Sequence, residues 1–153
     1  MLDRLLIHRV RPDAQLPMRA HPGDAGMDLV ASEDVQIMPG KRAKLGTGIA
    51  VAIPAGYVGY VHSRSGLAAK HGISVLNDPG VVDSGYRGEL FVLLHNASSH
   101  PYWIERGMRI AQLVIQKVQS PILVEDDAAW KASLNTSRGD KGSGSTGMAG
   151  FGD

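Results

Sequence analysis

The chain has 153 residues, 43% of them hydrophobic and 20% charged, which is typical of one compact folded domain and excludes a disordered chain. Sixteen basic residues against fifteen acidic ones leave a net charge of +1, which argues against a nucleic-acid partner bound by bulk charge. The absence of cysteine excludes disulfides, a thiolate nucleophile and a zinc–thiolate site. With no signal-peptide pattern and no apolar stretch of bilayer length, we expect a cytoplasmic protein without a membrane partner.

Glycine and proline recur along the chain and divide it into short runs rich in β-branched residues. Many short strands separated by turn signals predict an all-β sandwich or barrel. The runs expected to be strands are Leu5–Val10, Leu29–Val30, Val35–Met38, Lys44–Ile53, Tyr57–His62, Gly88–His95, Arg109–Val118 and Ile122–Val124.

One short internal helix is expected between Ser65 and Gly72, with Ser65 as a candidate cap and Gly72 at its end. From residue 133 onward the composition is dominated by glycine and serine, which cannot bury enough surface to offset the entropy of ordering. We therefore predict a β domain over residues 1–132, followed by a flexible glycine-rich arm over residues 133–153.

Two short segments have the residue types of a metal and phosphate site. Pro22-Gly-Asp-Ala-Gly-Met-Asp28 places two carboxylates four residues apart, a pattern typical of a surface turn but also of a carboxylate that faces Mg²⁺ through water. His62-Ser-Arg64-Ser65-Gly66 combines a guanidinium, a hydroxyl and a helix N-terminus, as phosphate sites do. Simple helix capping beside a solvated arginine explains the second segment about as well.

The densest segment is Asn77-Asp-Pro-Gly-Val-Val-Asp83-Ser-Gly-Tyr86-Arg-Gly88. Backbone N–H and C=O groups near Asn77 could form hydrogen bonds with the edge of a planar base. Asp83 follows two valines, so we expect it at a strand end, partly enclosed, where a carboxylate can act as a general base on water. Tyr86 offers a flat ring to a sugar. The alternative is a plain strand–turn–strand with Asp83 and Tyr86 at its rim.

Two later segments complete the set. In Arg106-Gly-Met-Arg109-Ile-Ala-Gln112-Leu, Gln112 lies within an apolar strand and needs partners there, either a phosphate or a neighbouring loop. Ser137-Arg138-Gly-Asp-Lys-Gly-Ser143-Gly-Ser-Thr-Gly147 is glycine-rich and cationic, which suits closure over a polyphosphate.

Taken in order and with their spacing, these five segments resemble the five motifs of the trimeric dUTPases, from about Gly23 to Gly147. The resemblance implies a jelly-roll-like, distorted β-barrel, a homotrimer whose active sites are shared between subunits, and Mg²⁺-dependent hydrolysis of dUTP to dUMP and pyrophosphate.

Carried over by position, the resemblance makes Asp28 the residue that holds Mg²⁺ through water and Asp83 the base that activates the attacking water. Tyr86 would stack on the deoxyribose and exclude a 2′-hydroxyl. The implied substrate-binding residues are Arg64, Ser65, Gly66, Asn77, Val81, Val82, Tyr86, Phe91, Gln112, Arg138 and Ser143.

One departure from the motifs concerns the tail, where an aromatic ring usually stacks on uracil. Ser143 occupies that position here, and Lys141 replaces a glycine before it. Stacking on an aromatic ring is worth about 1–3 kcal/mol per base, so closure is expected to be looser.

Two other functions compete with dUTP hydrolysis. A dCTP deaminase shares the fold but carries a glutamate base where Leu93 stands here, so deamination lacks its proton shuttle. A non-catalytic nucleotide-binding trimer is the second alternative, and Asp28, Arg64 and Asp83 argue against it.

Overall fold

The structure, a computed structural model, describes residues 4–136. These residues form eleven strands and two helices, which confirms the all-β prediction in its coarse form. In chain order they are β1 Leu6–Arg9, β2 Met27–Val30, β3 Val35–Ile37, β4 Arg42–Gly46, β5 Ile49–Ala52, β6 Tyr57–His62, α1 Ser65–His71, β7 Ile73–Val75, β8 Gly80–Val82, β9 Phe91–Asn96, β10 Tyr102–Ile104, β11 Arg109–Lys117 and α2 Asp127–Ser133.

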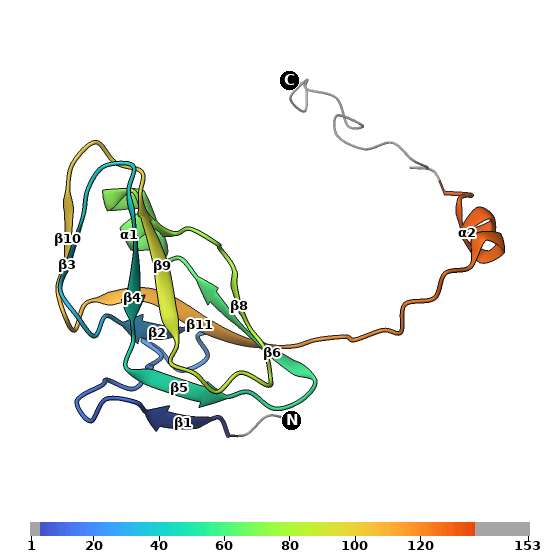
Figure 1. The fold of residues 1–153 in the computed structure, drawn as a ribbon, viewed down its shortest axis with the longest axis horizontal. Helices are drawn as coiled ribbons and strands as arrows, with labels where there is room; N and C mark the ends of the chain where they lie inside the picture. The colour runs from blue at the N-terminus through green and yellow to red at the C-terminus, as the bar shows by residue number, and fades with distance from the viewer. Residues whose placement is uncertain (1–3, 137–153) are drawn as a thin grey trace. The chain divides into compact units, whose positions relative to one another are not determined.

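The predicted distorted β-barrel is not observed: the strands of the described part pair in four separate sheets and do not close into one barrel, because no strand pairing joins one sheet to the next. Two sheets hold most of them, in the orders β2-β11-β6-β8 and β4-β9-β7. The pairs β1–β5 and β3–β10 are two-stranded and lie at different ends of the unit (Figure 1). Every strand pairing is antiparallel, as expected for strands joined by short connections.

The chain divides into two compact units, Met1–Ser120 and Pro121–Asp153. The first unit contains all eleven strands and α1. Its core gathers aliphatic side chains from every sheet, and the largest fully buried ones include Leu29, Ile37, Leu45, Ile49, Ile53, Ile73, Leu94, Ile104, Ile110 and Leu113. This core fixes the strands whose outer residues form the site.

Successive side chains of a strand point to opposite faces, so a polar residue between two buried ones points away from the core. Met27 and Leu29 of β2 are buried, so Asp28 between them lies on the opposite face. In β11 a register shift between Arg109 and Ala111 lets Ile110 and Ala111 both enter the core. After this bulge Gln112 pairs with Asp28 on one side and with His62 on the other.

Several predicted elements differ from the observed ones. Lys44–Ile53 is two strands, β4 and β5, because the chain turns at Thr47-Gly48, where Gly48 has a φ of 74°. The predicted strand Ile122–Val124 is wrong: these residues pair with no strand among the described residues and are 78–93% exposed. Helix α2 follows them in the second unit, where the sequence predicted none, and the Asp126 side chain caps it by accepting from the backbone N–H groups of Ala128 and Ala129.

Neither helix in the described part combines the length and the apolar character that crossing a bilayer requires.

Candidate active site

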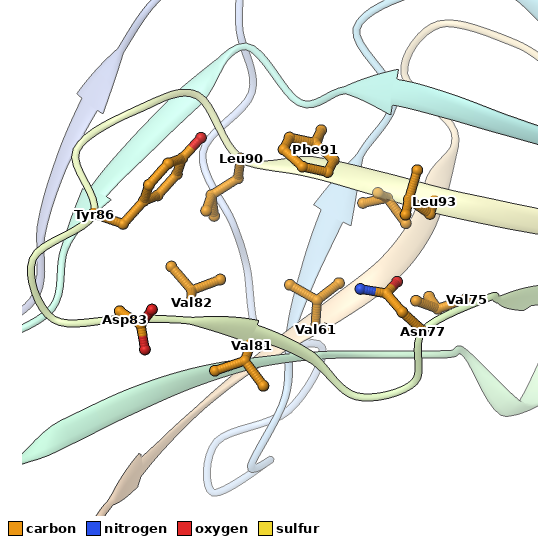
Figure 2. A pocket seen from close by; sticks show the side chains of 12 residues that line it. Val61, Val75, Asn77, Val81, Val82, Asp83, Tyr86, Leu90, Phe91 and Leu93 are labelled. Carbon is orange, nitrogen blue, oxygen red and sulfur yellow. The ribbon is translucent and has the colours of Figure 1, made fainter.

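A pocket of about 160 Å³ opens between β8 and β9 (Figure 2). Most of its wall is aliphatic, and its polar side chains are Asn77, Asp83 and Tyr86. The residues that line it are Val61, Val75, Asn77, Gly80, Val81, Val82, Asp83, Tyr86, Leu90, Phe91, Val92 and Leu93. An apolar slot with a few polar groups is the usual form of a small-molecule site.

Strand β8 forms one wall of this pocket. It is the last strand of its sheet and pairs only with β6, so its other edge has backbone N–H and C=O groups without a strand partner in the described part of the chain. Val82 is buried and turned into the space between β8 and β9, whereas Val81 points away from it and is 61% exposed (Figure 2). The free edge can therefore offer donors and acceptors to a planar ligand.

Tyr86 is held in place by its own turn. Its hydroxyl donates to the Glu89 carbonyl at 2.9 Å, and its backbone N–H donates to the Asp83 carbonyl at 3.0 Å. The ring lies against Gly88, where an added Cβ would be 2.5 Å from the hydroxyl oxygen. Any side chain at position 88 would thus displace the ring.

Asp83 directly follows β8, as predicted from the two valines before it. The expectation that its carboxylate is partly enclosed is wrong for the single chain, in which the residue is exposed. Strand β8 is three residues long and ends at Val82, so Asp83 belongs to the turn that follows, where it is exposed but still lines the pocket.

A second polar group of residues joins the first two motifs. The Asp28 carboxylate pairs with Arg64 Nε at 3.0 Å and with Arg109 Nη1 at 3.1 Å, and its side chain is only 18% exposed. Arg64 Nη1 also donates to the Arg109 carbonyl at 2.8 Å. The predicted metal-facing carboxylate and the predicted phosphate-binding arginine are thus in direct contact.

Helix α1 begins at Ser65 and ends before Gly72, which has a φ of 66°. The prediction that Ser65 caps the helix is wrong, because Arg64 is the N-cap residue and makes no capping hydrogen bond through its side chain. Ser65 is therefore the first helical residue, and its hydroxyl is left for another partner at the N-terminus of the helix.

The sequence left two kinds of partner open for Gln112, a phosphate or a neighbouring loop. In the structure its partner is the loop. Its Nε2 donates to the Ser63 carbonyl at 2.9 Å. Gly26 makes room for the side chain, since a Cβ there would lie 2.1 Å from Gln112 Oε1. This amide thereby joins β11 to the loop after β6.

The structure also brings together residues to which the sequence analysis gave no role in a dUTP site. His62 Nδ1 lies 2.7 Å from Asp78 Oδ1, and the Ser63 N–H donates to Asp78 Oδ2 at 2.7 Å. The histidine and the aspartate are sixteen positions apart, so no local spacing signals the pair. Leu90, Val92 and Leu93 were likewise not predicted as pocket residues.

Two of the predicted residues, Arg138 and Ser143, lie outside the residues that the structure describes, as does Lys141. Among residues 4–136, His, Asp and Glu side chains form no group of three that could hold a metal ion by themselves.

A family model described as dUTPase matches residues 12–147. The chain belongs to the dUTPase family.

Relatives of known name support this membership over nearly the full length. The deoxyuridine 5′-triphosphate nucleotidohydrolase of Mycolicibacterium gilvum is 54% identical over 149 residues, covering 96% of this chain and 97% of that protein. The enzyme of the same name from Thermobifida fusca is 53% identical over 145 residues, covering 94% of this chain and 79% of that protein.

Solved dUTPase structures share the fold. A mutant dUTPase of Staphylococcus bacteriophage 80alpha with dUpNHpp has a TM-score of 0.86 and 31% identity, covering 95% of this chain and 99% of that one. A mutant dUTPase from phage phi11 of S. aureus, described with a structural Mg(II) ion, has a TM-score of 0.76 and 29% identity, covering 82% and 97%. The predicted family is therefore confirmed, and the dUTPase match spans all five motifs quoted from the sequence.

Proposed function

We propose that this member of the dUTPase family hydrolyses dUTP to dUMP and pyrophosphate. The observation that carries the proposal is the pocket between β8 and β9, an apolar slot with Asn77, Asp83 and Tyr86 beside a free strand edge. Relatives more than 50% identical bear the name of this activity, and a neighbouring structure contains the dUTP analogue dUpNHpp.

In the proposed reaction a water molecule attacks the α-phosphorus and Asp83 accepts its proton. A bond forms between the water oxygen and the α-phosphorus, and the bond from this phosphorus to the bridging oxygen breaks, so that pyrophosphate leaves. The Asp83 side chain has no hydrogen-bond or ion-pair partner among the described residues, which leaves its oxygens free for that proton.

The base and the sugar are assigned to the pocket. The free edge of β8 at Val81 and Val82, together with the Asn77 amide, would hydrogen-bond the edge of uracil. Phe91 is part of the same wall. The Tyr86 ring, fixed against Gly88, would lie on the deoxyribose, where a 2′-hydroxyl would lose water without gaining a partner.

The phosphates are assigned to the cationic group and to the start of α1. Arg64 would supply charge, and Ser65 and Gly66 a hydroxyl and backbone N–H groups. Gln112 would join them by exchanging its bond to Ser63 for a phosphate oxygen or by holding that loop. Arg138 and Ser143 of the proposed C-terminal arm, residues 133–153, would close over the triphosphate.

Mg²⁺ fits this arrangement only as an ion held mainly by the substrate. Both oxygens of Asp28 already pair with arginines, so this carboxylate would reach the ion through water. Mg²⁺ beside phosphates commonly has one or two carboxylates and several waters. When bound, it would neutralise charge on the triphosphate.

The structure bears on the deaminase alternative as well. Leu93, which stands where that family has its glutamate base, lines the pocket. An aliphatic side chain at this place can move no proton, which favours hydrolysis at phosphorus over attack on the base.

A homotrimer with a jelly-roll-like subunit is part of the proposal, as is its place in the cytoplasm. Exposed apolar side chains support self-association: Leu6 is 72% exposed and Val81 is 61% exposed. A hollow lined by Leu6, Ile7, His8, Ala50, Val51, Ala52 and Arg87 lies beside β1 and β5. Sedimentation equilibrium at several concentrations tests the trimer, and a monomer at all of them would contradict it.

The activity is tested by pyrophosphate release from dUTP, dCTP, dTTP and UTP in the presence of Mg²⁺. We expect release from dUTP alone, and ammonia release from dCTP would support the deaminase. Asp83→Asn should abolish turnover while retaining affinity for a non-hydrolysable dUTP analogue. Full turnover by this variant would disprove the role of Asp83. If the unmodified protein cleaves none of the four nucleotides, the non-catalytic nucleotide-binding trimer is the alternative that remains.

A further inference from the structure

The Asp78 side chain joins two segments that the proposed function treats separately. Asp78 follows Asn77 in the loop that leads to β8. Its carboxylate accepts from the Ser63 N–H at 2.7 Å and lies 2.7 Å from His62 Nδ1. Ser63 comes immediately before Arg64, so one carboxylate connects the loop proposed to read the base with the segment proposed to bind phosphate.

Ser63 has all of its polar groups engaged. Its N–H donates to Asp78, its carbonyl accepts from Gln112 at 2.9 Å, and its hydroxyl accepts from the Val75 N–H at 2.9 Å. These partners come from three different elements, namely the loop before β8, β11 and β7. A residue just beyond a strand end is ordinarily free to move, whereas this one is fixed in position and orientation.

The position of Arg64 depends on this anchor. Arg64 has an extended backbone, with φ −91° and ψ 123°, and the helix begins at the next residue. Its guanidinium pairs with Asp28 and donates to the Arg109 carbonyl. Since the Ser63 amide is one residue away, its placement sets where the guanidinium and the first helical N–H groups point.

The charge of Asp78 suits this role. Partial burial raises the pKa of the Asp78 carboxyl, but hydrogen bonds from Ser63 and the contact with His62 outweigh burial and lower the pKa below 3.8. The side chain is therefore an ionised acceptor at neutral pH. Hydrogen bonds to an ionised acceptor are the stronger kind.

We propose that Asp78 is a positioning residue for the hydrolysis of dUTP: by holding Ser63 it aligns Arg64 and Ser65 with the loop that carries Asn77. This inference rests on the proposed function, and Asp78 itself touches neither substrate nor water in it.

The test compares Asp78→Ala and Asp78→Asn with a matched control, Asp34→Ala. Asp34 is also exposed and also accepts from a distant backbone N–H, that of Arg106 at 2.6 Å, but it belongs to neither the pocket nor the cationic group. We expect Asp78→Ala to lower kcat for dUTP about 10- to 100-fold, because small misplacements of catalytic groups cost rates of that order. Asp34→Ala should leave kcat unchanged.

Two further readouts separate positioning from a merely structural effect. Asp78→Asn retains an oxygen for the Ser63 N–H, so it should recover most of the lost kcat. Affinity for dUMP, measured by calorimetry, should change much less in Asp78→Ala than kcat does, because the pocket lining does not include Asp78. Equal kcat in Asp78→Ala and Asp34→Ala, or an equal loss of dUMP affinity and kcat, would overturn the proposal.

Hydrogen exchange of the Ser63 amide, followed by NMR in the unmodified protein, tests the anchor even if Asp78→Ala does not fold. The amide should be protected, and exchange at the rate of an open chain would refute the anchor. If the unmodified protein does not cleave dUTP but protects this amide, the proposed function fails while the anchor stands.

Discussion

Replacing Gly26 by alanine should push Gln112 out of its place. A Cβ at position 26 would lie 2.1 Å from Gln112 Oε1 and 3.0 Å from its Cδ, distances that no rotation of the terminal amide alone can relieve. Gln112 is confined between β2 and β6, with which β11 pairs on both sides. The glutamine must therefore change rotamer and release the Ser63 carbonyl.

The expected cost has two parts. Loss of the hydrogen bond to Ser63 costs about 1 kcal/mol, and a side chain held away from its preferred rotamer costs about 0.5–1.5 kcal/mol. Together they lower the free energy of unfolding by about 1.5–2.5 kcal/mol. For a chain of this length the melting temperature should fall by roughly 3–10 °C.

The assay is thermal unfolding of Gly26→Ala in two backgrounds, the unmodified chain and Gln112→Ala. Truncation of Gln112 removes the atoms at 2.1 and 3.0 Å and leaves one contact of 3.2 Å between two Cβ atoms, which a shift of a few tenths of an ångström relieves. Most of the penalty should vanish in the second background. An equal penalty in both would show that the clash with Gln112 is not the cause.

Three further predictions address the sugar, the core and the pH dependence. Tyr86→Ala should raise hydrolysis of UTP relative to dUTP by about 10-fold, measured as the ratio of the two kcat/KM values, and an unchanged ratio would exclude the ring as the sugar selector. Asn96→Leu should lower the free energy of unfolding, measured by urea denaturation, by about 2–3 kcal/mol. The reason is that the fully buried Asn96 amide donates to the carbonyls of Ile37 and His100. A urea midpoint equal to that of the unmodified chain would contradict this. The folded-state pKa of Asp78 is lowered, so the stability advantage of the unmodified chain over Asp78→Asn should be complete well above the ordinary pKa of an aspartate and lost as the pH falls through the lowered folded-state pKa. An advantage that persists in strong acid would contradict the carboxylate as its source.

The strand that sequence reasoning located best lies in a run of strand-forming residues bounded by turn signals. Tyr57–His62 was predicted with the observed bounds, because β-branched and aromatic residues fill it between turn signals. The break at Thr47-Gly48 was missed although a glycine stands there: Gly48 turns the chain with a φ of 74°, and the turn packs so closely that the Ala14 Cβ lies 2.7 Å from the position of a Cβ on Gly48. No local pattern contains such a contact.

The two errors near residues 122–133 have different causes. An apolar run such as Ile122–Val124 predicts a strand only if another strand is available to pair with it. Helix α2 was overlooked although Asp126 before Asp127-Ala-Ala is a capping signal that could have identified it.

For the site, residue types were predictable and contacts were not. Asp28 and Arg64 were each selected by their motif, but their 3.0 Å ion pair arises from the order β2-β11-β6 in the sheet. The bond between Ser63 and Asp78 joins two motifs that the sequence treats as separate. Motif reading selects the residues expected to bind a ligand and does not identify the residues that hold them in place.

The unpaired edge of β8 also bears on the solubility of the protein. A bare edge can recruit a strand from another molecule, and short length, proline and charge are the usual protections. Strand β8 has all three: it is three residues long, follows Pro79 and is followed by Asp83. A nucleotide bound along this edge would take the place of a neighbouring strand, so the ligand would shield the protein from aggregation while it is being converted.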